Sequence, residues 1–276
     1  GVPMYTHGFL PAVYQPTMFR PGDKPVLNLE LPKGVTLEQR RKNRALLNAL
    51  NEANLSEGDD EFAARMSAYD TAFKMQTEAP EIFDLSNESK ETLEMYGVGQ
   101  EPTDDYGRRC LLARRLVENG TRFVCVTSGG GSGQASEWDG HSDIDANHER
   151  MASWTDKPVA ALIKDLKRRG LLDSTVVIWG GEFGRSPESE GSNGRDHHNY
   201  GFSMYLAGGG FKRGFRYGAT DAIGLKAVEN PVHFRDLHAT ILNQLGLNQD
   251  QLSYLHLGRK ERLTEVHGKI LTDLLA

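Results

Sequence analysis

The sequence contains no long apolar run, and none approaches the roughly 18 residues with which a helix crosses a bilayer. It also has no excess of positive charge, since 38 Asp and Glu outnumber 32 Lys and Arg and the net charge is −6. This balance argues against a nucleic-acid surface, which needs clustered basic residues. The opening GVPMYTHGFLP does not have the pattern of a secretory signal peptide. We therefore expect no transmembrane segment and no nucleic-acid partner.

Cysteine is scarce as well. Cys110 and Cys125 both have apolar neighbours in the sequence, which is typical of free, structural cysteines. Two cysteines neither require an oxidising compartment nor exclude one. The remaining composition, 38% hydrophobic and 25% charged, is that of an ordinary globular protein long enough for one large domain.

Apolar periodicity and capping residues predict helices in the first half of the chain. These helices are expected at 36–55, 59–77, 86–96 and 104–119. Thr36 is a plausible N-cap of the first helix, which carries Leu46, Leu47 and Leu50 on one stripe. The second helix carries a Met and aromatic stripe that favours a place in the core.

The period changes after residue 120. Short β-branched apolar runs predict strands at 122–127, 174–179 and 202–207, and helices are expected at 145–169, 233–245 and 259–274. This alternation predicts an α/β fold with a mostly parallel sheet flanked by helices. We expect a single domain over 1–276, in which 36–119 is a helical insertion or cap and 120–276 is the α/β core.

Polar side chains follow the first predicted strand. A Gly- and Ser-rich loop leads from it to Asp139 and His141, and His148 comes at the start of the next helix. Aspartate and histidine at this spacing suit a divalent metal ion. The alternative is a turn in which Asp139 caps the helix while the histidines are solvated.

The second predicted strand runs directly into the segment GGEFGRSP. Glu182 is expected at the carboxyl end of this strand, where ligands bind in open α/β sheets. Gly181 and Gly184 would let the backbone approach a ligand closely. Arg185 is suited to gripping two oxygens of a phosphate or sulfate group. We therefore expect catalytic roles for Glu182 and Arg185, and the alternative is a surface ion pair between them.

A third polar segment, GRDHHN, lies between the second and third predicted strands. Histidine is a common metal ligand whose tautomer is fixed by a second-shell acceptor. Asp196 could supply that acceptor or be a ligand itself, and a solvated loop is the alternative. The candidate metal ligands are therefore Asp139, His141, Glu182, Asp196, His197 and His198.

Two common catalytic signatures are missing. The loop SGGGSG lacks the Lys-Ser/Thr that ends a phosphate-binding P-loop and is not a GxGxxG that opens a helix. The sequence also lacks a GxSxG nucleophile elbow. Nucleotide binding and Ser-His-Asp hydrolysis are therefore disfavoured.

Several stretches, in order along most of the chain, resemble the family called domain of unknown function 1501, a branch of the alkaline phosphatase/sulfatase superfamily. They are GFLPAVYQ, YDTAFKMQ, RRCLLARRLVENGTRFV, WDGH, DLKRRGLLDSTVVIWGGEFGRSP, GRDHHN, LAGGGFKRG with YGATD, and DLHATILNQLG. The resemblance implies one or two divalent metals at the strand ends, beside a Ser, Thr or modified Cys nucleophile. Carried onto this sequence, it places metal ligands at Asp139, His141, Glu182 and His197 or His198.

The sequence departs from the family's pattern in two places. Glu182 stands where relatives have an Asp followed by His, and Phe183 takes the second place, which removes one ligand. The family's first strand, Gly-Gly-Pro-Ser-like turn and twin-arginine export signal do not occur in this sequence. The resemblance therefore implies a periplasmic or secreted protein that lacks its N-terminal part, one metal ligand and the nucleophile. Thr127, Ser128 and Ser186 are conceivable substitutes without an adjoining base in sequence.

Residues and resemblance together predict a metal-dependent hydrolase of phosphate or sulfate esters. Its substrate would be a small-molecule or carbohydrate ester, and its cofactor zinc, calcium or magnesium. Two alternatives stay open. One is a non-catalytic, secreted metal- or ligand-binding module of the same fold, and the other is a phosphomutase-like enzyme that uses 36–119 as its cap.

Overall fold

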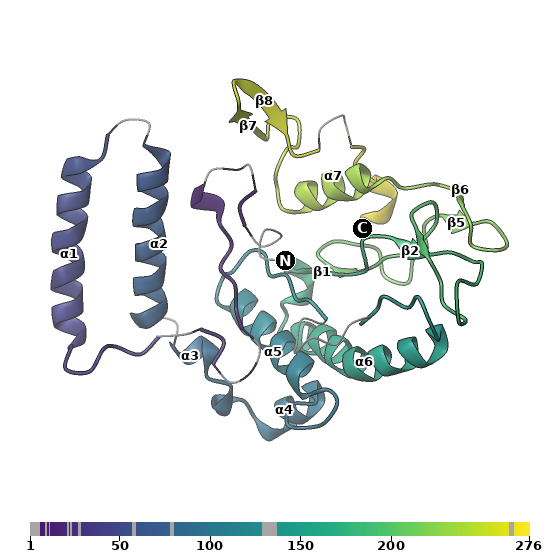
Figure 1. Ribbon diagram of the computed structural model, residues 1–276, viewed down its shortest axis with the longest axis horizontal. Coiled ribbons are helices and arrows are strands. Elements are labelled where there is room, and N and C mark those ends of the chain that lie inside the picture. Colours follow the sequence, from purple (N-terminus) through teal and green to yellow (C-terminus); the bar gives the residue numbers. More distant parts are fainter. Residues whose placement is uncertain are drawn as a thin grey trace. The chain divides into compact units, whose positions relative to one another are not determined.

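The computed structural model describes residues 6–8, 10, 12–20, 22, 24–26, 29–56, 59–77, 80–128, 137–264 and 268–276 (Figure 1). The chain divides into two compact units, residues 1–88 and 89–276. All predicted site residues belong to the second unit. No described helix is both long enough and apolar enough to cross a membrane. The assignment of 36–119 as a cap on a core at 120–276 stays a prediction.

The first unit is helical. Its elements are η2 (Ala12–Tyr14), α1 (Leu37–Asn54), α2 (Asp60–Thr77), α3 (Pro80–Phe83) and η3 (Leu85–Asn87). Thr36 caps α1 as predicted, because its Oγ1 accepts from the Gln39 N–H while the Gln39 side chain accepts from the Thr36 N–H. Arg44 of α1 donates through Nε to Asp70 Oδ1 of α2 at 2.9 Å and so joins these two helices.

The apolar stripe of α1 is exposed. Leu46, Leu47 and Leu50 are 62%, 51% and 52% accessible, and no residue of α1 is buried. Tyr69, from the Met and aromatic stripe expected in the core, is 56% accessible. The periodicity therefore predicted these helices correctly but did not determine which of their side chains are buried.

The second unit has its core between α5 and α6. Its helices are α4 (Lys90–Tyr96), α5 (Asp104–Glu118), α6 (Ile144–Arg168), η4 (Leu172–Ser174), α7 (Phe234–Gln244) and η5 (Thr272–Leu274). Tyr96, Leu111, Met151 and Leu166 are each at most 1% accessible. The helices expected at 104–119, 145–169 and 233–245 are confirmed to within one or two residues at each end.

A buried carboxylate joins three of these helices. Asp165 of α6 is 0% accessible and forms an ion pair with Nε of Arg114 at 3.0 Å. It also accepts hydrogen bonds from the Tyr96 hydroxyl at 3.2 Å and from Arg169 Nε at 3.0 Å. Burial raises the pKa of Asp165, but the hydrogen bond from Arg169 and the charges of Arg114 and Arg169 outweigh it and hold that pKa below its ordinary value.

The strands form four separate antiparallel pairs. They are β1 (Val176–Trp179) with β4 (Tyr205–Gly208), β2 (Gly184–Arg185) with β3 (His197–His198), β5 (Ala219–Thr220) with β6 (Ala227–Glu229), and β7 (Ser253–His256) with β8 (Arg259–Arg262). The described residues contain no large parallel sheet. The predicted α/β fold with a mostly parallel sheet, and with it the alkaline-phosphatase/sulfatase-like architecture, is therefore wrong for this structure. The strands predicted at 174–179 and 202–207 do pair, as β1 and β4, but they run antiparallel because no helix lies between them in the chain to carry it back to the start of a parallel strand.

The strand predicted at 122–127 is likewise not formed. The segment is extended, but within the described chain the backbone of Phe123–Val126 makes no backbone hydrogen bond. An apolar run becomes a strand only when a neighbour supplies hydrogen-bond partners. Cys125 in this segment is exposed, whereas Cys110 is buried, and both are free thiols.

The prediction of a helix at 259–274 is also wrong. Residues 253–262 form the β7–β8 hairpin, in which His256 pairs with Arg259 across a two-residue turn. Leu257 and Gly258 in this turn both have positive φ, +48° and +79°. Positive φ at both central residues suits the right-handed twist of a hairpin, so the turn overrides the helix-like pattern that follows it.

Candidate metal centre

Three of the predicted ligands converge in space, and we call them the donor triangle: Asp139, His141 and His197. Asp139 Oδ1 lies 3.0 Å from His141 Nε2 and 3.0 Å from His197 Nε2. The two Nε2 atoms lie 3.2 Å apart. Three donors about 2.1 Å from a shared ion, at angles of roughly 90–110°, are separated by about 3.0–3.4 Å. The donor triangle therefore has the dimensions of one face of a metal coordination sphere.

The donor triangle joins two distant parts of the sequence. Asp139 and His141 lie in the loop that leads into α6, and His197 lies in β3. The pairing of β3 with β2 sets His197 directly opposite Arg185. The short β2–β3 ladder therefore brings the GRDHHN segment and the GGEFGRSP segment to the same site.

The loop before α6 is hydrogen-bonded to the turn that precedes β3. Three backbone hydrogen bonds connect them: Asp143 N–H to Ser192 O at 2.9 Å, Ile144 N–H to Asn193 O at 3.1 Å, and Arg195 N–H to Gly140 O at 3.0 Å. A Cβ on Gly194 would lie 2.0 Å from the His141 carbonyl oxygen, so only glycine permits this approach. The backbone itself therefore sets the distance between His141 and His197.

Arg185 holds the carboxylate of the donor triangle. Its Nη2 donates to Asp139 Oδ1 at 2.7 Å and to the Trp138 carbonyl at 3.3 Å, while Nη1 donates to the Arg195 carbonyl at 3.1 Å. The hydrogen bond from Arg185, followed by that from His197, lowers the pKa of Asp139 to about 2. Asp139 is therefore ionised at neutral pH, and Arg185 is bonded to protein acceptors.

A residue that the sequence did not single out orients His141. Glu190 Oε2 lies 2.9 Å from His141 Nδ1, and this contact raises the pKa of His141 above its ordinary value. Glu190 opens a tight turn closed by Gly194, whose N–H donates to the Glu190 carbonyl at 2.7 Å. When His141 donates its Nδ1–H to Glu190, the lone pair of Nε2 faces the other two donors.

Phe183 packs on the other histidine. Its ring centroid lies 4.3 Å from that of His197, which in turn lies 4.9 Å from the His141 ring. Phe183 stands at the position for which the sequence resemblance implied the loss of one metal ligand. Here it limits the orientation of the His197 ring.

The remaining predicted ligands lie outside the donor triangle. Glu182 is exposed and belongs to neither group of potential ligand atoms among the described residues. Asp196 forms a second such group with His141 and Glu190, and its Oδ1 accepts from the His197 N–H at 2.6 Å. His198 Nε2 lies 2.5 Å from the Leu225 carbonyl oxygen, which directs it towards the segment before β6.

Two of the three hydroxyls considered as nucleophiles, those of Ser128 and Ser186, are held in hydrogen bonds. Ser128 Oγ accepts from Trp138 Nε1 at 3.0 Å. Ser186 Oγ accepts from the Asp196 N–H and donates to the Glu188 carbonyl, each at 3.0 Å. Neither contact would raise the nucleophilicity of a hydroxyl, which requires a neighbouring base.

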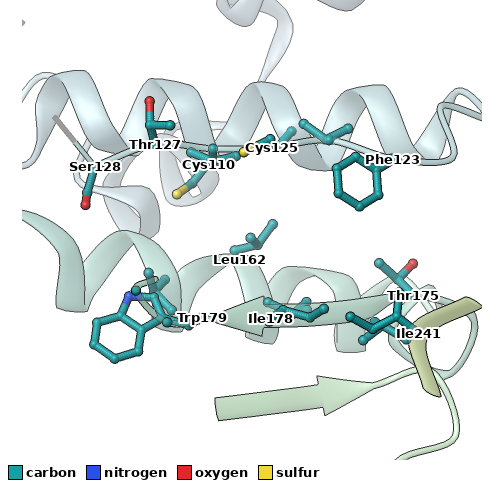
Figure 2. A pocket seen from close by; sticks show the side chains of 18 of the residues that line it. Cys110, Phe123, Cys125, Thr127, Ser128, Leu162, Thr175, Ile178, Trp179 and Ile241 are labelled. Carbon is teal, nitrogen blue, oxygen red and sulfur yellow. The ribbon is translucent and has the colours of Figure 1, made fainter. Parts of the chain in front are cut away.

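A groove of about 1840 Å³ reaches the donor triangle. Asp139, Arg185, His197 and Glu182 line one part of it. The extended segment 121–128 and β1 form facing walls of another part (Figure 2). The donor triangle is therefore accessible to a ligand from this groove.

A family model described as "Protein of unknown function (DUF1501)" matches residues 2–275 of the sequence. No curated protein matches the chain, and no solved structure matches it. The match agrees with the family resemblance of the sequence motifs and carries no assignment to the alkaline phosphatase/sulfatase superfamily.

Proposed function

We propose that this chain, which belongs to the DUF1501 family, binds one divalent metal ion through Asp139, His141 and His197. The observation that carries the proposal is the mutual approach of the three donor atoms to 3.0–3.2 Å. Two imidazole nitrogens and one carboxylate oxygen favour zinc or a similar transition metal. Calcium and magnesium are disfavoured because they prefer oxygen ligands.

We further propose that the site hydrolyses phosphate or sulfate esters. A centre with three protein ligands leaves a position open, as in catalytic rather than structural zinc sites. A bound ion of this kind acts as a Lewis acid on an ester oxygen and lowers the pKa of water. The proposal rests on the donor set and on access from the groove, since the described residues contain no parallel sheet that would support it by fold.

The surrounding residues prepare the site for a cation. Arg185 keeps Asp139 ionised, Glu190 fixes the tautomer of His141, and Phe183 restricts the His197 ring. The contacts of Glu190 and Phe183 reduce the reorganisation needed when an ion binds, whereas Arg185 would share Asp139 Oδ1 with that ion.

A second candidate is a metal-binding module without catalysis. It is favoured by Arg185, whose guanidinium donates to Asp139, Trp138 and Arg195 rather than to an open substrate position. The hydrogen bonds that hold Ser128 and Ser186 also favour this candidate, because they leave neither hydroxyl beside a base. Both candidates share the metal site and differ only in turnover.

Aryl phosphate and aryl sulfate hydrolysis by the purified chain, with zinc and after chelation, separates the two. The hydrolase proposal predicts zinc-dependent turnover that is lost in Asp139→Ala and retained in His198→Ala. Stoichiometric zinc binding without turnover of either ester would support the binding module. Absence of zinc binding would contradict both.

A further inference from the structure

A second feature of the groove is independent of the metal site. The extended segment 121–128 and β1 lie on facing walls, with Phe123, Cys125 and Thr127 on one side and Ile178 and Trp179 on the other (Figure 2). Helices α5, α6 and α7 contribute further lining, including Cys110, Leu162 and Ile241. The groove is therefore bounded by two extended stretches of backbone and covered by apolar helix faces.

Both walls have backbone groups for which the described residues supply no partner. Phe123–Val126 make no backbone hydrogen bond within the described chain. The sole described sheet partner of β1 is β4, which occupies one edge of that strand. In an antiparallel pair, alternate residues direct their N–H and C=O groups away from the partner strand. The free edge of β1 and the backbone of Phe123–Val126 therefore both offer donors and acceptors, whereas the Thr127 carbonyl already accepts from Arg109.

Both walls carry apolar side chains that are partly exposed to solvent. VVIW in β1 and FVCV in the facing segment are continuous apolar runs, a pattern typical of strands that are covered on both faces. Yet Phe123 is 73% accessible and Trp179 is 43% accessible. Contiguous exposed apolar surface of this kind marks a binding site.

We propose that this groove binds an extended apolar polypeptide strand supplied by a partner. The strand would pair with the free edge of β1 on one side and with residues 122–127 on the other, continuing the β1–β4 sheet. An apolar small molecule or a helix would cover the side chains but leave the backbone donors and acceptors of both walls unsatisfied, which is costly.

The chemistry of the partner follows from the walls. A strand between two neighbours and beneath helices is buried on both faces, so its sequence should be a continuous run of Val, Ile or similar residues. The described strands of the second unit are already paired with one another. The described part of a second copy therefore offers no free strand other than the groove wall itself. We assign the occupant to a different polypeptide segment.

The test uses a synthetic peptide of valine and isoleucine flanked by lysines, with its ends acetylated and amidated. A matched peptide carries the same side chains but has alternate backbone amides N-methylated. Binding is followed by the fluorescence of Trp138 and Trp179, which both line the groove. We expect saturable one-to-one binding of the first peptide and about tenfold or greater weakening for the second, because it lacks strand hydrogen-bond donors.

Two protein variants locate the binding. Phe123→Asp places a charge on the groove wall and should weaken binding about tenfold, whereas Phe215→Asp, at a 50% accessible phenylalanine outside the groove, should leave it unchanged. Equal affinity for both peptides would overturn the proposal, because it would indicate a nonspecific apolar site. The proposal would also be overturned if the first peptide did not bind. A dimer of the protein that this peptide fails to dissociate would overturn it as well, because the groove would then be covered by a second copy.

Discussion

Glu190 Oε2 lies 2.9 Å from His141 Nδ1, although 49 residues separate the two in the sequence. The contact directs the other ring nitrogen, Nε2, to Asp139 and His197. In metal proteins a carboxylate in this position fixes the tautomer of the ligating histidine and increases its basicity. Glu190 is therefore the residue of this pair whose substitution should affect metal binding without removing a donor of the triangle.

Glu190→Gln should lower zinc affinity about 10- to 100-fold, because the amide supplies a weaker acceptor without charge for the Nδ1–H. Competition with a chromophoric chelator measures the dissociation constant. Glu188→Gln is the matched control, since Glu188 is exposed and lies outside both groups of potential ligands. Equal affinities of the Glu190→Gln variant and the wild type would contradict the role of Glu190.

Gly194→Ala should separate the two segments that carry the donor triangle. The added Cβ would meet the His141 carbonyl oxygen at 2.0 Å, which the backbone must relieve by moving. We expect weaker zinc binding and a loss of roughly 1–3 kcal/mol in unfolding free energy. In the control Gly181→Ala, the nearest atom to the new Cβ lies at 3.5 Å, so both quantities should stay close to wild type. Similar behaviour of the two variants would contradict the proposed backbone clamp.

Asp165→Asn should destabilise the second unit by up to about 3–5 kcal/mol, because the buried Arg114 loses one of its two carboxylate partners and keeps only Glu118. Denaturant unfolding followed by tryptophan fluorescence gives the value. Asp173→Asn is the control, because Asp173 and its partner Arg213 are both highly exposed and such pairs contribute at most about 1 kcal/mol. A small effect of Asp165→Asn would show that the ion pair is not needed for stability.

The same carboxylate predicts an acid dependence. Its pKa in the folded protein lies below the ordinary value, so its contribution to stability is present above the unfolded-state pKa of about 3.9. That contribution is lost as the pH falls through the lower folded-state pKa. Unfolding free energy measured from neutral to acidic pH should therefore fall less steeply in Asp165→Asn than in wild type below about pH 4. Parallel curves would contradict the lowered pKa.

The helices of the second unit could be predicted because local signals agree with their packing. The helix at 145–169 combines an apolar period with a terminating glycine, Gly170, and α6 forms at nearly those residues. The pairing of strands could not be predicted in the same way. The run at 122–127 specifies an apolar segment, but hydrogen bonding to a neighbour decides whether it becomes a strand, and β1 pairs antiparallel with β4 instead.

The site was partly predictable for a related reason. The residue types of Asp139, His141 and His197 and their places after strand-like runs predict metal ligands, and the structure brings their donor atoms together. Glu190 was missed because its contact with His141 depends on how the turn at 190–194 packs against the loop before α6. Glu182 was included on its position after β1, but the structure leaves it outside the donor triangle.

The most direct test is zinc stoichiometry, measured by calorimetry on the wild type and on two single variants of neighbouring histidines. His197 belongs to the donor triangle, whereas His198 contacts the Leu225 carbonyl. We predict one zinc ion per chain in the wild type and in His198→Ala, and none in His197→Ala. A wild type that binds no zinc, or equal binding by the two variants, would contradict the metal centre.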